Sequence, residues 1–232
     1  MKKQSEVSTF YLQNLQCPIE NRRNVIGFLV ISMDFLGLLP LLSIPFFAPL
    51  FWAALIPIIC IHIWALLYII APYKFEKSYY LYLGVFGIVN AFVYFLVIQK
   101  FLYRHVGVEG SSYFVIGILL MFLLLVSIQI INAKMLYSGT YTKLQNGESK
   151  FNVSLIIAAS SFGYIIAQFL MSYLVTDSAY MIAMITAYSV ASILPAYLST
   201  YIHRFIYIQN NYEKVINSYP DFGKPKTSRK FG

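Results

Sequence analysis

Two ionisable side chains lie inside otherwise apolar stretches of the sequence. Asp34 interrupts the run FLVISMDFLGLLPLL, and His62 interrupts the next apolar run along the chain. A carboxylate in the middle of a membrane-spanning helix costs about 2.5–3.5 kcal/mol, so it should face a partner or be protonated. Because the two residues lie at matching depths in consecutive spans, we predict that they meet. Asn90, in a third apolar run, is the second candidate partner for Asp34.

This intramembrane polar cluster has two interpretations. In the first, Asp34 and His62 hold or pass a proton, because histidine changes its charge near neutral pH and a neighbouring carboxylate can exchange the proton. In the second, Asp34, His62 and Asn90 form a clasp of satisfied polar groups that holds three helices in register. We prefer the clasp, and the sequence leaves both interpretations open.

The elements that must position these side chains are helices in a membrane. Of the 232 residues, 59% are apolar or aromatic and 11% are charged, whereas about 25% are charged in an average soluble domain. A hydrocarbon core about 30 Å thick needs about 20 apolar residues per crossing. We therefore predict an all-α integral membrane protein, a bundle of six transmembrane helices. The predicted spans are residues 25–43, 48–70, 79–99, 113–131, 153–174 and 179–202.

The first two spans are separated by prolines rather than by charges. Pro40, Pro45 and Pro49 cluster where the first apolar run gives way to the second, and each proline removes a backbone donor and disfavours helix at the preceding residue. This cluster predicts a tight hairpin. The first two spans are then antiparallel neighbours, which is why Asp34 and His62 can meet.

Basic residues are divided unequally between the two sides of the predicted bundle. Lys100 and Arg104 lie on one side, and the other 15 Lys and Arg residues lie on the side that holds both termini. Positively charged loops stay in the cytoplasm. We therefore predict a multi-pass protein of the cell membrane with a cytoplasmic N-terminal arm (1–24) and a cytoplasmic C-terminus. Anionic lipid accounts for the net charge of +8, so no nucleic-acid partner is expected.

The segments outside the spans carry few signals. Residues 100–113 form the predicted outer loop that is long enough for recognition, and residues 203–232 form a basic cytoplasmic tail whose end we expect to be flexible. After the sixth span, apolar residues recur at spacings of three and four, which predicts a short interfacial helix. These residues are Phe205, Ile208, Tyr212 and Val215.

Small residues recur every four positions in the fifth and sixth spans. Small side chains let membrane helices approach closely, so this pattern predicts that the two spans pack against each other. The residues are Ala159, Gly163 and Ala167 in one span and Ala183, Ala187 and Ala191 in the other.

Catalytic and metal-binding signatures are absent from the sequence. It contains no zinc-binding H-E-x-x-H, no G-x-S-x-G nucleophile motif and no second intramembrane carboxylate for an aspartyl protease. Cys60 and His62 are two residues apart on a helix, so they point to different faces and make a poor nucleophile and base. We therefore expect no enzyme activity, no metal site and no cofactor.

Two classes of function remain. The first is an interaction protein, an accessory subunit or immunity-type protein that binds other membrane proteins or a secretion machine, or forms a homo-oligomer. The alternative is a proton-coupled transporter or channel, or the permease subunit of an ABC exporter. Six spans with both termini inside resemble the exporter permeases of the ABC-2 type, whose first interfacial helix the arm STFYLQNLQ would match. That family usually has a re-entrant link between its last two spans, for which TDSA is too short.

Overall fold

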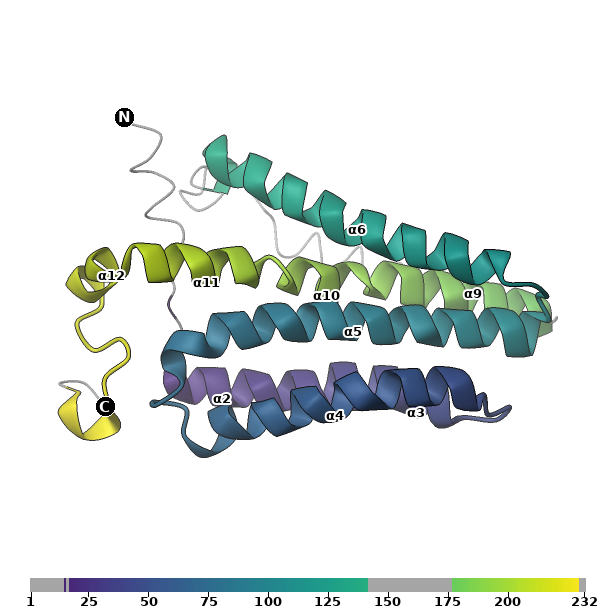
Figure 1. Ribbon diagram of the computed structural model, residues 1–232, viewed down its shortest axis with the longest axis horizontal. Helices are drawn as coiled ribbons and strands as arrows, with labels where there is room; N and C mark the ends of the chain where they lie inside the picture. The colour runs from purple at the N-terminus through teal and green to yellow at the C-terminus, as the bar shows by residue number, and fades with distance from the viewer. Residues whose placement is uncertain (1–14, 16, 142–176, 230–232) are drawn as a thin grey trace, which may run out of the picture.

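The computed structural model describes residue 15 and residues 17–141 and 177–229. Over this part the chain is helical, with no strand. Five helical stretches are long and apolar enough to cross a membrane, and they lie side by side along one direction (Figure 1). These stretches are Pro18–Leu42, Ala48–Ile70, Glu76–Val106, Ser112–Tyr137 and Tyr180–Asn210. The fold is therefore all-α and suited to a membrane, and the fifth predicted span (153–174) lies outside the described residues.

The first long helix changes its winding along its length. It consists of α2 (Pro18–Gly27), the π-helix η1 (Phe28–Leu38) and one α-helical turn, α3 (Leu39–Leu42). Proline at the first helical position has a suitable φ angle and lacks only a donor that would be unpaired there anyway. The helix therefore starts at Pro18, before the first predicted span. Residues 18–24, which were predicted to belong to the N-terminal arm, thus form the start of the first long helix.

A short proline-containing turn joins this helix to the second. Ser43 and Phe47 have extended backbones and flank the turn. The second helix, α4 (Ala48–Ile70), covers the same residues as the second predicted span. The two helices run in opposite directions (Figure 1), as the proline cluster predicted.

Helix α5 is the centre of the bundle. The 3₁₀ turn η2 (Glu76–Ser78) leads into α5 (Tyr79–Phe101), and the π-helical turn η3 (Leu102–Val106) continues it. In the most apolar part of this stretch 67% of the residues are buried, against 28% or less in the other four. Helix α5 packs against α4 and η1 on one side and against the last helices of the chain on the other (Figure 1).

Two glycines bring α5 against the last helical stretch. A Cβ atom on Gly84 would lie 2.5 Å from the Ile202 side chain, and one on Gly87 would lie 2.5 Å from the Pro195 carbonyl oxygen. No side chain fits at these positions unless the helices separate. The sequence analysis did not identify this contact, although the pair has the i, i+3 spacing that puts both glycines on one face.

The last long stretch is divided into three helices. Helix α9 (Asp177–Ala191) ends before Ser192, α10 (Ile193–Leu198) follows, and α11 (Tyr201–Asn210) starts after Ser199 and Thr200. Proline lacks the amide hydrogen for an intrahelical bond, and Pro195 lies in α10 next to one of these interruptions. The helical stretch continues beyond the last predicted span, which ended at residue 202.

Helix α6 (Ser112–Tyr137) lies at the outside of the bundle. Only Asn132 and Leu136 of this helix are buried in the described structure. It contacts α5 and α10, and it diverges from α11 towards its C-terminal end (Figure 1). Most of its apolar surface is therefore exposed.

The predicted small-residue contact involves residues that the structure does not describe. Ala159, Gly163 and Ala167 lie outside the described part of the chain. In α9, Ala187 is exposed, and Ala183 and Ala191 are half-buried. The proposed packing of these two stripes stays a prediction.

The C-terminal apolar stripe packs onto the bundle. A short helix, α12 (Tyr212–Ser218), does follow α11, but Ile208 and Val215 are fully buried in the main core. These two side chains are covered by protein and not by lipid. The stripe predicted a helix correctly, and its apolar face serves protein packing.

The end of the basic tail is also held by the bundle. Glu76 accepts hydrogen bonds from the Gly223 amide at 2.6 Å and from the Arg229 guanidinium at 2.5 Å. The Glu76 and Arg229 side chains are 5% and 7% exposed. The expectation of a flexible tail end is therefore wrong for the residues up to Arg229, because a buried ion pair fixes them next to η2.

Candidate functional site

The structure brings Asp34 and His62 into contact. The Nε2 atom of His62 lies 3.1 Å from Oδ1 and 3.4 Å from Oδ2 of Asp34. The other ring nitrogen, Nδ1, lies 2.9 Å from the Ile58 carbonyl oxygen one turn earlier in α4. Both ring nitrogens thus lie within hydrogen-bond distance of an oxygen. We call Asp34 and His62 the acid–imidazole pair.

The acid–imidazole pair lies at the outer surface of the first two helices. The His62 and Asp34 side chains are 37% and 40% exposed. His62 is eight residues from the end of α4, about 12 Å along the helix at 1.5 Å per residue. The pair is therefore far from the helix ends, yet it is not enclosed by the described part of the bundle.

Asn90 belongs to a different polar group. Its Nδ2 atom lies 2.5 Å from the hydroxyl of Ser32, and the Tyr94 hydroxyl lies 3.0 Å from the same Ser32 oxygen. Asn90 is fully buried, and no hydrogen bond joins it to Asp34 or His62 in the described part of the chain. The predicted three-residue cluster is thus two sites, the exposed acid–imidazole pair and a buried Ser32–Asn90–Tyr94 group.

Tyrosine hydroxyls hold the π-helical segment. Tyr94 donates to the Ser32 carbonyl oxygen at 3.2 Å, and Tyr188 of α9 donates to the Leu36 carbonyl oxygen at 2.9 Å. Buried carbonyl groups need such partners in an apolar environment. Helices with π winding are rare and occur frequently at functional sites. The wide turns of η1 carry both Asp34 and Ser32.

Lys100 was predicted to lie in a loop, but the structure places it inside a helix. The prediction assigned it to an outer loop, but α5 and η3 continue past it to Val106, and Lys100 is fully buried. Its Nζ atom lies 2.6 Å from the Pro40 carbonyl oxygen, 2.5 Å from the Ser43 carbonyl oxygen and 3.0 Å from the Ser43 hydroxyl. A basic side chain at the C-terminal end of a helix donates hydrogen bonds to the free carbonyl groups of that helix. It also interacts favourably with the negative end of the helix dipole.

The position of Lys100 in the sequence contained a usable signal. It comes directly after the polar residue Gln99, at the end of a long apolar run, and lysines in a last turn commonly bond to helix-terminal carbonyls. Partner carbonyls about 60 residues earlier could not be read from the sequence. The structure therefore adds Lys100 as a residue that joins the turn between the first two helices to α5.

No protein-family model, no curated protein sequence and no solved structure matches this chain. The chemistry of its own side chains is therefore the basis for a function. Among the described residues that chemistry includes the acid–imidazole pair at the surface, the buried hydroxyl–amide group, the buried lysine on carbonyls and the buried Glu76–Arg229 ion pair.

Proposed function

We propose that this chain acts by binding other membrane proteins, as an accessory, regulatory or immunity-type protein without catalytic activity, through the face that carries the acid–imidazole pair. The observation that supports this is the exposure of Asp34 and His62 far from the ends of their helices. Their polar groups reach the outside of the bundle at a depth where lipid would surround them.

Lipid is a poor environment for this pair. An ionisable side chain near the bilayer centre is unfavourable, and such residues almost always face protein or a water-filled cavity. Here more than a third of each side chain is exposed, and in the described part of the chain the two oxygens of Asp34 share one donor, Nε2 of His62. A helix of another protein, or of a second copy of this chain, would cover the exposed part and complete its hydrogen bonds.

The surrounding surface suits a helix as partner. Ile59 and Leu66 lie three residues before and four residues after His62 on α4, so they share its face, and they are 47% and 50% exposed. A polar pair flanked by aliphatic side chains is a common form of contact between membrane helices, in which hydrogen bonds across the interface add to close packing.

Site-specific photocrosslinking tests this binding face. We place a photoreactive amino acid at Ile59 and, as the control, at Leu123 of α6, which is 65% exposed. The proposal expects a discrete protein adduct from position 59, identified by mass spectrometry, that disappears when Asp34 is replaced by Ala. Lipid adducts alone at position 59, or the same protein adducts from both positions, would contradict it.

We further propose that the chain crosses the cell membrane six times, with both termini in the cytoplasm. What supports six crossings is the position of the described helices: α6 ends at the end of the bundle where α2 starts, and α9 starts at the opposite end (Figure 1). The intervening chain contains the apolar run 153–174, about 33 Å long as a helix. The distribution of Lys and Arg supports the cytoplasmic position of the termini.

Labelling of single cysteines tests this topology. With Cys17 and Cys60 replaced by Ser, we introduce Ser111→Cys or Ser138→Cys; both positions are exposed at opposite ends of α6. A thiol reagent that cannot cross membranes should label position 111 in intact cells and position 138 only after permeabilisation. The reverse pattern would place both termini outside.

A proton-coupled transporter, or the permease subunit of an ABC exporter, is the second candidate function. The interruptions of the last helical stretch at Ser192 and at Ser199–Thr200 favour it, together with the π-helix η1, because transporters bind their substrates at broken helices. Purified protein in liposomes tests this candidate. Proton flux that Asp34→Asn abolishes without loss of folding would support a transporter, and its absence would favour the binding protein.

A further inference from the structure

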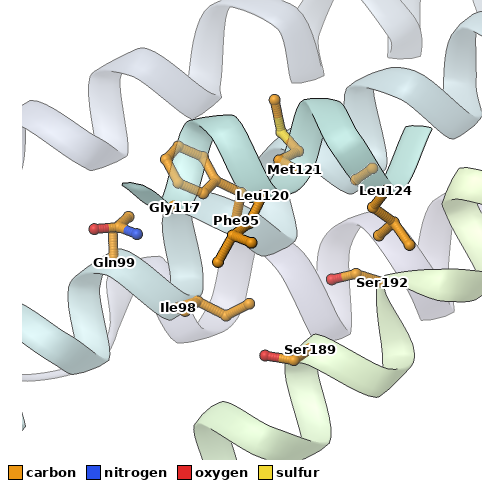
Figure 2. A pocket seen from close by; sticks show the side chains of 10 residues that line it. Phe95, Ile98, Gln99, Gly117, Leu120, Met121, Leu124, Ser189 and Ser192 are labelled. Carbon is orange, nitrogen blue, oxygen red and sulfur yellow. The ribbon is translucent and has the colours of Figure 1, made fainter. Parts of the chain in front are cut away.

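A cavity of about 210 Å³ lies between α5, α6 and α9. Its walls are mostly apolar and include Phe95 and Ile98 of α5 and Leu120 and Met121 of α6 (Figure 2). No charged side chain lies among the lining residues. The cavity is independent of the acid–imidazole pair, none of whose residues lines it.

Gln99 is the polar side chain of this cavity that lacks a partner. Its residue is 1% exposed, and neither the oxygen nor the nitrogen of its amide makes a hydrogen bond to any described residue. The two serines in the lining are satisfied, because Ser189 donates to the Ile185 carbonyl and Ser192 donates to the Tyr188 carbonyl. A buried amide without hydrogen bonds is unfavourable, so a group that is missing from the protein itself is expected to complete it.

Gly117 makes room for this amide. A Cβ atom at position 117 would collide with Nε2 of Gln99 and with the Phe95 ring. Figure 2 shows Gln99 beside Gly117 at one side of the lining. The glycine on α6 thus allows an amide to lie in a site that is otherwise built from hydrocarbon.

We infer that this cavity binds a small, uncharged, membrane-dissolved amphiphile whose hydroxyl group accepts a hydrogen bond from Nε2 of Gln99. Nε2 is the amide atom that faces the other lining side chains, and the amide oxygen points away from them (Figure 2). The apolar walls accept the hydrocarbon part of the ligand, and the absence of charged groups from the lining excludes a strong preference for an ionic head group. Ligand pockets generally combine apolar walls with a few polar groups that orient the ligand.

The size of the cavity limits the ligand. An apolar cavity of about 150 Å³ holds benzene, so about 210 Å³ accommodates roughly one ring with a short chain, or an alkyl chain of about eight carbons. The ligand would reach the site from the surrounding hydrocarbon. We therefore choose a photoreactive eight-carbon alkanol as the probe and the alkane without the hydroxyl as its matched control.

The test compares covalent labelling of the purified full-length protein by the two probes. Labelled peptides are mapped by mass spectrometry, and the peptides that contain Phe95–Gln99 and Gly117–Met121 report on the cavity. We expect the alkanol to label these peptides about fivefold more than the alkane, since one hydrogen bond to a buried group contributes roughly this factor. Gln99→Leu should remove that preference while the alkane still labels the cavity.

Two further variants keep the inference falsifiable. Gln129→Leu makes the same change on α6 at a residue that donates to the Ser199 hydroxyl at 2.9 Å and does not line the cavity; the alkanol preference should persist. Leu120→Trp fills the cavity from an exposed position and should reduce labelling by both probes. The inference would be overturned if both probes labelled the unaltered protein equally, or if the alkanol preference survived Gln99→Leu. It would also be overturned if neither probe labelled the cavity peptides, which would indicate that water alone occupies the site.

Discussion

The Nζ atom of Lys100 lies 2.5 Å from the carbonyl oxygen of Ser43. This contact joins the end of α5 to the turn between the first two helices, although the two residues are far apart in the sequence. It also satisfies carbonyl groups that the C-terminal end of α3 leaves free. The buried lysine is thus part of the structure that positions Asp34 and His62 on their antiparallel helices.

Replacing Lys100 with Met should destabilise the protein. The Leu41 carbonyl oxygen would lose its donor in a buried position, and the partly buried carbonyl oxygens of Pro40 and Ser43 would lose the same donor. An unpaired buried polar group costs about 1–3 kcal/mol. Thermal or denaturant unfolding in detergent measures the free energy of unfolding. Lys134→Met is the matched control, because Lys134 is exposed near the end of α6. An equal effect of the two substitutions would show that the carbonyl contacts contribute nothing.

Replacing Gly87 with Ala should destabilise the protein, whereas replacing Gly27 with Ala should not. A Cβ atom at Gly87 meets backbone atoms of Pro195 and Ser199 at 2.5 and 2.7 Å, so Gly87→Ala must push α10 away from α5. Overpacking of this kind costs about 1–3 kcal/mol. Gly27→Ala has open space around the new Cβ and should stabilise the helix by up to about 1 kcal/mol.

The two glycine variants are measured by the same unfolding assay. The comparison is direct because each substitution adds one methyl group to a helix. Destabilisation by Gly27→Ala as large as that by Gly87→Ala would contradict the close approach of α5 and α10.

The buried ion pair between Glu76 and Arg229 should hold the tail in place. Glu76→Gln leaves Arg229 buried without a counter-ion, and breaking a buried pair in this way costs about 3–5 kcal/mol. The tail should therefore detach, and limited proteolysis should cleave it between Ser218 and Arg229 much faster. Lys224→Met removes a more exposed ion pair with Asp221, which is worth about 1 kcal/mol or less, and should leave the cleavage rate nearly unchanged.

In the isolated protein the acid–imidazole pair should contribute little to folding. Asp34 and His62 are half-exposed, and exposed ion pairs typically contribute about 0.2–1 kcal/mol. A double-mutant cycle with Asp34→Ala and His62→Ala measures their coupling energy in detergent. A coupling of several kcal/mol would favour the clasp interpretation over a binding face.

Much of the architecture could be predicted from the sequence. The lengths of the apolar runs predicted an all-helical chain with several long apolar helices, which the structure confirms. The cluster of prolines predicted the turn after Leu42, because proline acts locally on the backbone. The matched depths of Asp34 and His62 predicted that the two side chains contact each other, and the structure places Nε2 of His62 3.1 Å from Oδ1 of Asp34.

Other features depended on information that is not local. The side to which Asp34 and Asn90 point depends on the winding of η1, and a π-helix rotates side chains differently from an α-helix. Hydropathy assigned Lys100 to a loop because it ranks lysine as a surface residue, whereas partners about 60 residues away keep it buried. The attachment of the tail likewise depends on the long-range contact between Glu76 and Arg229.

The buried contact of Arg229 also affects how the protein should be tagged. A reporter domain fused behind this arginine would begin next to a contact that is nearly closed to solvent, and its bulk would compete with the docked segment. The exposed turn at Gly107–Ser111, where two glycines have positive φ angles, is a better insertion point because exposed turns tolerate added residues. Fluorescent or affinity labels inserted there would leave the ion pair undisturbed.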